Sequence, residues 1–320
     1  MRKARCIVFV LLFCLLLQLT GCAAAQKPLR VTLVLKTVTE VAEFWGTLLS
    51  GVEKAAEEYG VELKVLTSPR EIDIDKQIEL IRQVTEEKPD VMILSAADYD
   101  RCAEATEEAI AAGIGVVAID TDVNAAGRAC YVGSNNYQIG LEMGWAMADY
   151  LPEGGKVAVI QHMLTTTTGI DRTRGVLDAL NEAGNIDILG SFCCDNSTEQ
   201  ARAITTELLS EDPEIRGFVC TNEVCNVGAA NALADLGMGG QVFVVGCDNS
   251  QRQIQFLEQN IIQAIVTQRP FNMGYMAVQQ AVRVANGEQT DDFVEVACVL
   301  ITRENMYTQE NQKLLFPILR

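Results

Sequence analysis

The chain has 320 residues, a formal net charge of −18 and a single histidine. A surplus of carboxylates repels phosphate backbones and anionic lipid surfaces, so the charge excludes nucleic acid as a partner and excludes membrane attachment through charge. The length suits one large domain or two ordinary domains.

The N-terminus has the pattern of an export signal. Residues 1–5 hold three basic side chains, and an apolar run of 12 residues follows at 6–17. A membrane-spanning helix needs about 20 apolar residues, whereas about 7–15 after a basic start are typical of a secretory signal peptide. The next residues, "LTGC" at 19–22, resemble the lipobox of bacterial lipoproteins. The resemblance implies a signal peptide at 1–21, acylation of Cys22 and a tether at 22–28; an ordinary signal peptide with a chance cysteine is the alternative.

The first half of the remaining chain alternates short apolar runs with longer segments of helical spacing. The runs are nearly continuous in Val, Ile and Leu, a pattern typical of parallel strands covered by helices on both faces. The expected strands are 30–36, 61–66, 90–95 and 115–120, and the expected helices are 44–59, 75–87 and 101–112.

The same pattern starts again in the second half. Here the expected strands are 156–161, 187–192, 217–221, 241–246 and 261–268, and the expected helices are 168–183, 198–209, 224–236, 251–259 and 271–285. We therefore predict an α/β protein with two doubly wound parallel-sheet lobes. Ligands of such sheets bind at the carboxyl ends of the strands, so a cleft between the lobes would be lined by both sets of strand ends.

Polar side chains follow the expected strands. Lys36, Asp120, Asp122, Asn196, Asn222, Asp248 and Gln268 all lie at strand ends. Carboxylates and amides make paired hydrogen bonds to adjacent hydroxyl groups. Phe44 and Trp45 follow the first strand and either stack on a ligand ring or begin a core helix. Trp145 is expected in the core, and His162 is expected to be a hydrogen-bonded polar residue near a strand end rather than a ligand contact.

Signals of enzyme chemistry and of metal binding are weak. The sequence has no GxSxG nucleophile elbow, no Walker loop and no GxGxxG that opens a first helix. It also lacks a CxxC pair, so we expect neither a metal nor a cofactor. Eight cysteines lie beyond Cys22; they are either free buried thiols, which we favour, or disulfides with 105 conceivable pairings.

Several stretches together resemble the periplasmic binding proteins of the ribose and simple-sugar type, which are the substrate-binding subunits of bacterial ABC importers. Five of these stretches are "KPDVMILSAAD", "AGIGVVAIDTDV", "DRTRGVLDAL", "CTNEVCNVGAANAL" and "VVGCDNS". The resemblance covers residues 30–307. It implies a type I periplasmic binding protein-like fold with a three-segment hinge. The implied lobes are 29–133 plus 269–297 and 134–268 plus 298–308, followed by a tail at 309–320 that either packs against a lobe or extends free of it.

The resemblance also implies a ligand-binding set. Its residues are Lys36, Glu43, Phe44, Trp45, Asp120, Asp122, Arg172, Asn196, Asn222, Asp248 and Gln268. The sequence departs from the ribose-type pattern in a longer loop after Lys36, in Thr121 where an arginine is common, and in Asn196 where an aromatic residue is expected. These departures point away from ribose itself and leave another sugar, a polyol or another small polar solute.

The function implied is capture of a small solute, most simply a monosaccharide or polyol, by an exported monomer that delivers it to an ABC permease. The protein would be anchored through its lipid on the outer face of the cytoplasmic membrane, or be periplasmic. A sensor subunit that reports to a receptor or histidine kinase is the alternative, and an enzyme on the same scaffold is a third reading.

Lipidation gives the first test. In a bacterial host, metabolic labelling with a fatty acid should mark the wild type and not Cys22→Ser, because the acyl chain is attached at the thiol. Cys14→Ser, in the apolar run of the signal, is the matched control and should label like the wild type. Equal labelling of Cys22→Ser would contradict the lipobox interpretation.

Overall fold

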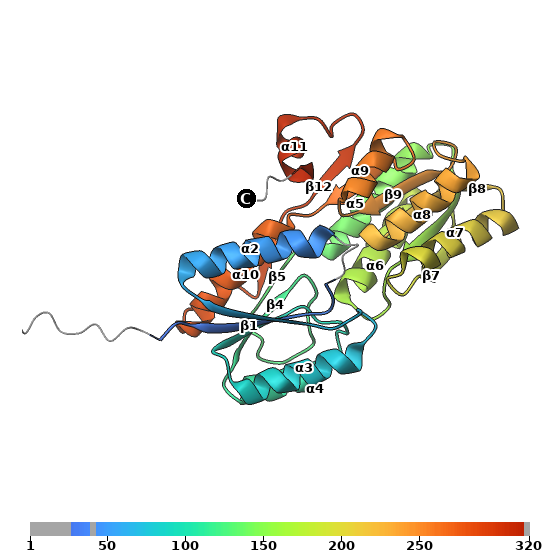
Figure 1. The fold of residues 1–320 in the computed structure, drawn as a ribbon. Coiled ribbons are helices and arrows are strands. Elements are labelled where there is room, and N and C mark those ends of the chain that lie inside the picture. The colour runs from blue at the N-terminus through green and yellow to red at the C-terminus, as the bar shows by residue number, and fades with distance from the viewer. Residues whose placement is uncertain (1–26, 39–42, 317–320) are drawn as a thin grey trace, which may run out of the picture.

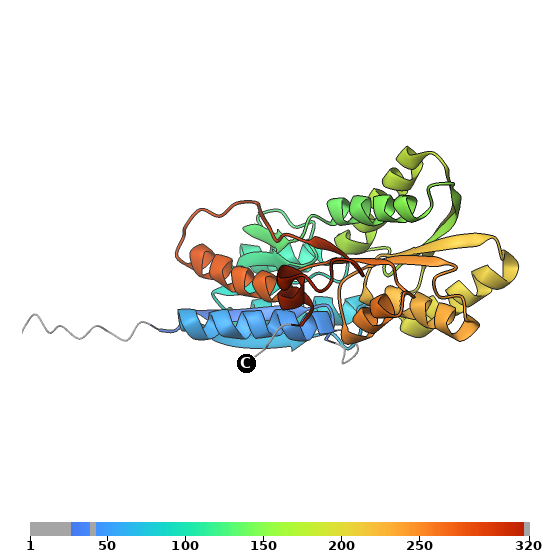
Figure 2. The same cartoon turned by 90° about the horizontal axis from the view of Figure 1, so that it is seen from above.

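The computed structural model describes residues 27–38 and 43–316 as two α/β lobes that lie side by side along the long axis of the molecule (Figures 1 and 2). The predicted signal peptide and Cys22 lie outside the described residues. In the described part, no helix is long and apolar enough to cross a membrane. The alternation of strands and helices that the sequence predicts is confirmed.

The first lobe is built on a six-stranded parallel sheet. Its strands are β1 (Arg30–Leu35), β2 (Glu62–Thr67), β3 (Val91–Leu94), β4 (Gly115–Ile119), β5 (Cys130–Gly133) and β11 (Phe293–Glu295), in the spatial order β11-β5-β4-β3-β1-β2. Helices α2 (Glu43–Tyr59) and α10 (Pro270–Ala285) pack together on one face, and α3 (Ile74–Glu87) and α4 (Ala103–Ala111) cover the other. Residues of β1, β3 and β4 are buried, as expected of strands covered on both faces.

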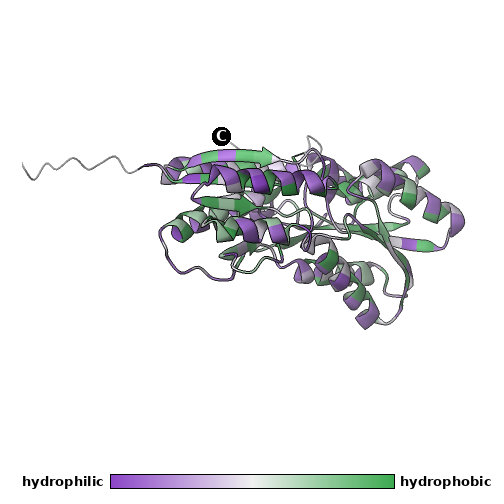
Figure 3. Ribbon diagram, turned by 90° about the horizontal axis from the view of Figure 1, so that it is seen from below, coloured by the Kyte–Doolittle hydropathy of each residue, from purple (hydrophilic) through white to green (hydrophobic). Residues whose placement is uncertain are grey.

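The second lobe repeats this plan. Its strands are β6 (Gly155–Gln161), β7 (Ile186–Cys193), β8 (Ile215–Cys220), β9 (Phe243–Cys247), β10 (Ala264–Thr267) and β12 (Val299–Thr302), in the order β12-β10-β9-β8-β6-β7. Only β12 runs antiparallel to its neighbour in this sheet. Helices α5 (Asn136–Tyr150) and α6 (Thr167–Ala183) cover one face, and α7 (Thr198–Glu211), α8 (Glu223–Leu236) and α9 (Gln251–Glu258) cover the other. Figure 3 shows apolar strands inside and polar helix faces outside.

The chain passes between the two sheets three times. The passages lie between β5 and α5, between β10 and α10, and between β11 and β12. Strand β11 returns to the first sheet after β10, and β12 then returns to the second, so neither sheet is made from one continuous stretch. The three connecting segments are the only covalent links between the described lobes.

Helices α5 and α6 approach each other closely because glycines face each other at their contact. A Cβ atom on Gly140 would lie 2.2 Å from the carbonyl oxygen of Arg172, and one on Gly175 would lie 2.3 Å from that of Tyr137. Such contacts exclude any side chain at these two positions. The contact therefore fixes the position of α6, and with it the backbone of Arg172.

Trp145 is 41% exposed, so its prediction as a core residue is wrong. Met143 and Met147 occupy the buried face of α5, and Trp145 lies on the opposite side of the helix.

The tail forms a further helix, α11 (Gln309–Leu315), that packs on the second lobe through the buried side chains of Asn311 and Leu315.

Candidate functional site

The site is built around two aspartates in equivalent positions of the two lobes. Asp120 follows β4 and Asp248 follows β9, and both adopt left-handed backbone conformations, with φ of 62° and 69°. The N–H of Asp120 donates to the carbonyl of Val132 (3.0 Å), and that of Asp248 donates to the carbonyl of Val266 (2.9 Å). Non-glycine residues rarely adopt this conformation, and such strained residues cluster at functional sites.

A buried cation compensates Asp120 in the first lobe. Lys36, at the end of β1, lies 2.9 Å from a carboxylate oxygen of Glu71 and 3.3 Å from one of Asp120, and all three side chains are buried. Burial alone would lower the pKa of Lys36, but the two carboxylates outweigh it and the pKa is raised above its ordinary value. Lys36 therefore stays charged and anchors both acids.

An arginine has the same role in the second lobe. The guanidinium of Arg172, on α6, donates to Asn136 (2.9 Å) and to the carbonyl of Thr221 (2.9 Å). Its Nη1 lies 3.9 Å from a carboxylate oxygen of Asp248. Gln268 donates to the other oxygen of Asp248 at 2.6 Å. Each buried aspartate thus has a buried cation as neighbour, as a low-dielectric interior requires.

Hydrogen bonds connect the two lobes across the site. The amide of Asn196, from the loop after β7, donates to Glu71 of the first lobe at 2.8 Å. Asn222, after β8, donates to the amide oxygen of Asn196 at 2.8 Å. Lys36, Glu71, Asn196 and Asn222 therefore form one polar chain from the first sheet to the second.

Two aromatic rings form the remaining wall. Phe44 and Trp45 begin α2, and their ring centroids lie 5.2 Å apart in an edge-to-face arrangement. Trp45 is buried in the core of the first lobe and also lines the cavity, with the ammonium of Lys36 5.7 Å from its ring centroid. Of the two roles that the sequence left open for Trp45, the core role is confirmed, and stacking on a ligand ring stays a prediction.

Glu223 is the most perturbed carboxyl group in the site. It is the first residue of α8 and is buried, and one of its carboxyl oxygens has no hydrogen-bond partner. Burial first, and then the neighbouring carboxylates of Asp248 and Glu43, raise its pKa to about 8. At neutral pH the protonated group provides a hydrogen-bond donor next to Asp248.

His162 follows β6 and is fully buried between two threonines. Its ring nitrogens lie 2.7 Å from the hydroxyl of Thr221 and 3.1 Å from that of Thr168. Burial, together with Lys36 and Arg172, holds the pKa of His162 well below its ordinary value. The imidazole is neutral and hydrogen-bonded, the structural role that the sequence favoured, although its side chain also lines the cavity.

These residues enclose a cavity of about 40 Å³, which we call the polar cavity. It is lined by Lys36, Phe44, Trp45, Glu71, Asp120, His162, Thr168, Arg172, Asn196, Asn222, Glu223, Val224, Asp248 and Gln268. All of the predicted ligand residues line it except Glu43 and Asp122. The predicted ligand set left out Glu71, which lies in the loop between β2 and α3 and not directly at a strand end, and Glu223, whose place just after Asn222 at a strand end was the available signal.

The two remaining predicted residues point elsewhere. Asp122 forms an ion pair with Arg128, at 2.7 Å, in a neighbouring groove between the lobes. Glu43 accepts a hydrogen bond from the backbone N–H of Gln251 at 3.2 Å, and its side chain lines a second cavity beside the first. The strand-end rule located the segment of Asp122, and the family resemblance located that of Glu43, but neither indicated which of the neighbouring side chains faces the cavity.

Within the described residues, no group of histidine, cysteine and acidic side chains is arranged to hold a metal ion. The eight cysteines of this part of the chain are free thiols: six are buried, and Cys193 and Cys298 are half-buried. The site therefore consists of charged, amide and aromatic side chains, which suit recognition of a small polar molecule by hydrogen bonds and ring stacking.

Comparison with known proteins gives consistent matches. A family profile described as periplasmic binding protein domain matches residues 32–289. The D-ribose/D-allose-binding protein of Pseudomonas aeruginosa is 27% identical over 289 residues, which are 87% of this chain and 89% of that protein. The crystal structure of a sugar transporter from Clostridium phytofermentans has 30% identity and a TM-score of 0.79, covering 85% of this chain and 98% of that one.

The fold is also that of a carbohydrate transporter solute-binding protein from Agrobacterium radiobacter in complex with D-arabinose. That likeness has a TM-score of 0.86 at 23% identity and covers 91% of this chain and 100% of the other. It confirms the predicted two-lobe architecture of parallel sheets.

Glu223 makes stability depend on pH. In the unfolded chain its carboxyl ionises above about pH 4.5, whereas in the folded protein it stays protonated up to about pH 8. The folded protein holds the proton of Glu223 more tightly than the unfolded chain does. The contribution of this group to the free energy of unfolding is therefore fully present below pH 4.5 and is lost as the pH rises to about 8. Over this pH interval, the free energy of unfolding of the wild type should fall by about 1 kcal/mol or more relative to that of Glu223→Gln. This corresponds to a fall on the order of 2–4 °C in melting temperature.

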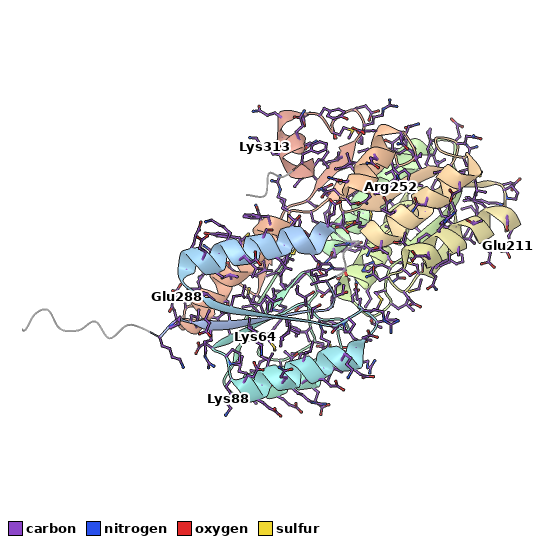
Figure 4. The ribbon with its side chains drawn as sticks, in the orientation of Figure 1. Lys64, Lys88, Glu211, Arg252, Glu288 and Lys313 are labelled. Carbon is purple, nitrogen blue, oxygen red and sulfur yellow. The ribbon has the colours of Figure 1, made fainter. Side chains whose placement is uncertain are left out.

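Thermal melts from pH 5 to pH 9 measure this difference. Glu211→Gln is the matched control, because Glu211 is exposed at the far end of α7 (Figure 4), and it should follow the wild type. Parallel curves for the wild type and Glu223→Gln would contradict a protonated Glu223.

Proposed function

The chain belongs to the periplasmic binding protein domain family, in its ribose and simple-sugar group, and on that premise we propose that it captures a small sugar between its two lobes and delivers it to an ABC importer. Export fits the family, and we include in the proposal an acyl anchor at Cys22 and a monomeric state. The ligand enters outside the cytoplasm, binds without turnover and is passed to a permease.

One observation carries this proposal: two aspartates, one from each lobe and each with a buried cation beside it, line one small cavity. Asp120 with Lys36 and Asp248 with Arg172 line the same cavity from the two lobes, together with the amides of Asn222 and Gln268. A carboxylate accepts two hydrogen bonds from adjacent hydroxyl groups, and a cation donates to the ring and hydroxyl oxygens. A pyranose or furanose presents both kinds of group around one ring.

The aromatic wall supports a ring-shaped ligand. One edge of a sugar ring carries hydroxyl groups, and its C–H face is apolar, so it packs on a flat aromatic side chain. Phe44 and Trp45 provide such surfaces beside the aspartates. A purely ionic ligand would gain nothing from them, and an apolar ligand would leave the carboxylates unpaired.

The size of the cavity supports a mechanism of lobe closure. Sites for small molecules usually have volumes of about 300–1,000 Å³, far above the 40 Å³ of the polar cavity. A sugar therefore enters only when the lobes separate, which breaks the contact of Asn196 with Glu71. The three connecting segments are suited to act as the hinge, because only they must change direction.

The relatives indicate the class of ligand. One is named a D-ribose/D-allose-binding protein and another a D-allose-binding periplasmic protein, from Escherichia coli, with 26% identity over 90% of this chain and 96% of that protein. We propose that the sugar unit bound in the polar cavity is an aldose ring of five or six carbons. Asn196 in place of an aromatic residue makes this cavity more polar on the side of the second lobe.

Asp248→Asn tests this function. A hydrogen bond from a ligand hydroxyl to a carboxylate contributes about 1.5–3 kcal/mol, so its loss should weaken sugar binding roughly 10- to 150-fold. Isothermal titration calorimetry with the sugar that copurifies with the protein, identified by mass spectrometry, measures the change.

Asp187→Asn is the matched control, because Asp187 is exposed at the start of β7 and far from the cavity. Cys247→Ala, one residue before Asp248 in the buried strand, should lower stability modestly and leave affinity near the wild-type value. Unchanged affinity in Asp248→Asn would contradict the role given to this strand end.

A further inference from the structure

A second and larger cavity adjoins the polar cavity. Its volume is about 420 Å³, within the range of about 300–1,000 Å³ that is usual for small-molecule sites. Phe44, Asp248 and Gln268 line both cavities, so these three side chains form the wall between them. We call the larger space the outer chamber.

Three helices and one strand end build the outer chamber. The starts of α2 and α10 contribute Thr47 and Asn272, the segment after β9 contributes Asn249, and α11 closes the side away from the polar cavity. Figures 1 and 2 both show α11 beside the starts of α2 and α10. Helix α11 lies beyond residues 32–289, to which the family profile extends, so the chamber depends on a segment outside that match.

The lining combines apolar and polar side chains. We call the apolar ones the floor (Phe44, Pro270, Phe271, Leu314 and Leu315) and the polar ones outside the shared wall the rim (Glu43, Thr47, Asn249, Arg269, Asn272, Glu310 and Lys313). Lys313 lies on α11, on the outer side of the molecule (Figure 4). In the rim, a guanidinium nitrogen of Arg269 lies 3.9 Å from a carboxylate oxygen of Glu310, so the two opposite charges leave hydrogen-bonding groups free for a neutral guest.

This combination of side chains fits one class of ligand. An alkyl or aryl group would pack on the floor and leave the polar groups of the rim without hydrogen-bond partners, whereas an ionic ligand would bond to the rim and gain nothing from the two phenylalanine rings. A second sugar ring uses both, because its C–H face packs on aromatic rings and its hydroxyl groups bond to amides and carboxylates. Phe44, in the shared wall, is only half-buried and is the second residue of α2, so a guest that occupies both spaces would require a change of its rotamer.

We propose that the ligand is a disaccharide, with one ring in the polar cavity and the second ring in the outer chamber closed by α11. The proposal rests on the sugar-binding function proposed above and extends it to the class of sugar. It assigns to the C-terminal helix a direct part in recognition.

Titration calorimetry with two panels of sugars tests the proposal. The monosaccharides are D-ribose, D-allose, D-xylose, D-arabinose, D-glucose and D-galactose, and the disaccharides are xylobiose, cellobiose, maltose, lactose and melibiose. At least one disaccharide should bind tenfold or more tightly than either of its component monosaccharides. A bulky side chain in the chamber should remove this advantage.

Asn272→Trp and Thr47→Trp fill the chamber from two different helices, and neither residue lines the polar cavity. Each should bring the affinity for the disaccharide to within threefold of that for the monosaccharide, and leave monosaccharide binding unchanged. Thr206→Trp, at an exposed position of α7, is the matched control and should behave as the wild type. Circular dichroism identifies any variant that fails to fold.

The outcomes separate the two proposals. If a monosaccharide binds and no disaccharide binds more tightly, the disaccharide proposal is overturned and the sugar-binding function stands. If the disaccharide advantage survives in both chamber variants, the outer chamber is not its cause and the proposal is equally overturned. If no sugar of either panel binds, the proposed function fails, and the inference fails with it.

Discussion

Compensation of two buried aspartates by two buried cations is the constraint on which the rest of the structure depends. Asp120 and Asp248 are each about 95% buried. A carboxylate in such a position is unfavourable by several kcal/mol unless it is paired and hydrogen-bonded. Lys36 and Arg172 supply this pairing. The end of β1 must therefore lie within reach of the end of β4, from which only β3 separates it in the sheet, and Arg172 of α6 must lie near the end of β9.

The same arrangement links folding to lobe closure. Glu71 holds Lys36 on one side and receives the amide of Asn196 on the other, so one carboxylate joins the charge pairing of the first lobe to the second lobe. In the proposed opening of the lobes, Lys36 keeps both of its acidic neighbours, and the contact that is lost here is the hydrogen bond from the Asn196 amide to the Glu71 carboxylate. Opening is therefore inexpensive in electrostatic terms, because no buried ion pair has to break.

Much of this arrangement could be predicted from the sequence, because parallel strands leave a strong pattern. Continuous apolar runs identified the strands, and the strand-end rule then identified Asp120, Asp248 and Asn222 without knowledge of the fold. Glu71 could not be found in this way, since a loop between β2 and α3 has no periodicity. The rule also failed to separate Asp120 from Asp122, because side-chain direction after a strand depends on the local turn, here a left-handed residue paired to β5.

Other features depended on tertiary context. Trp145 has a large apolar side chain within a helical pattern, yet small and medium residues of α5 fill the contact with α6, where glycines face each other, and leave the indole outside. The tail was undecided in the sequence because seven helical residues are too few to be stable alone. Packing of Leu315 on the second lobe stabilises α11 and creates a wall for the outer chamber.

The central claim is that a sugar is enclosed by closure of two lobes around the paired aspartates. Small-angle X-ray scattering of the protein, ligand-free and at proven saturation with the copurified sugar, tests this claim most directly. The account predicts a smaller radius of gyration with bound sugar, because the amide of Asn196 can reach Glu71 only when the lobes are closed. The same radius of gyration in both samples would contradict a closing binder and indicate a rigid site.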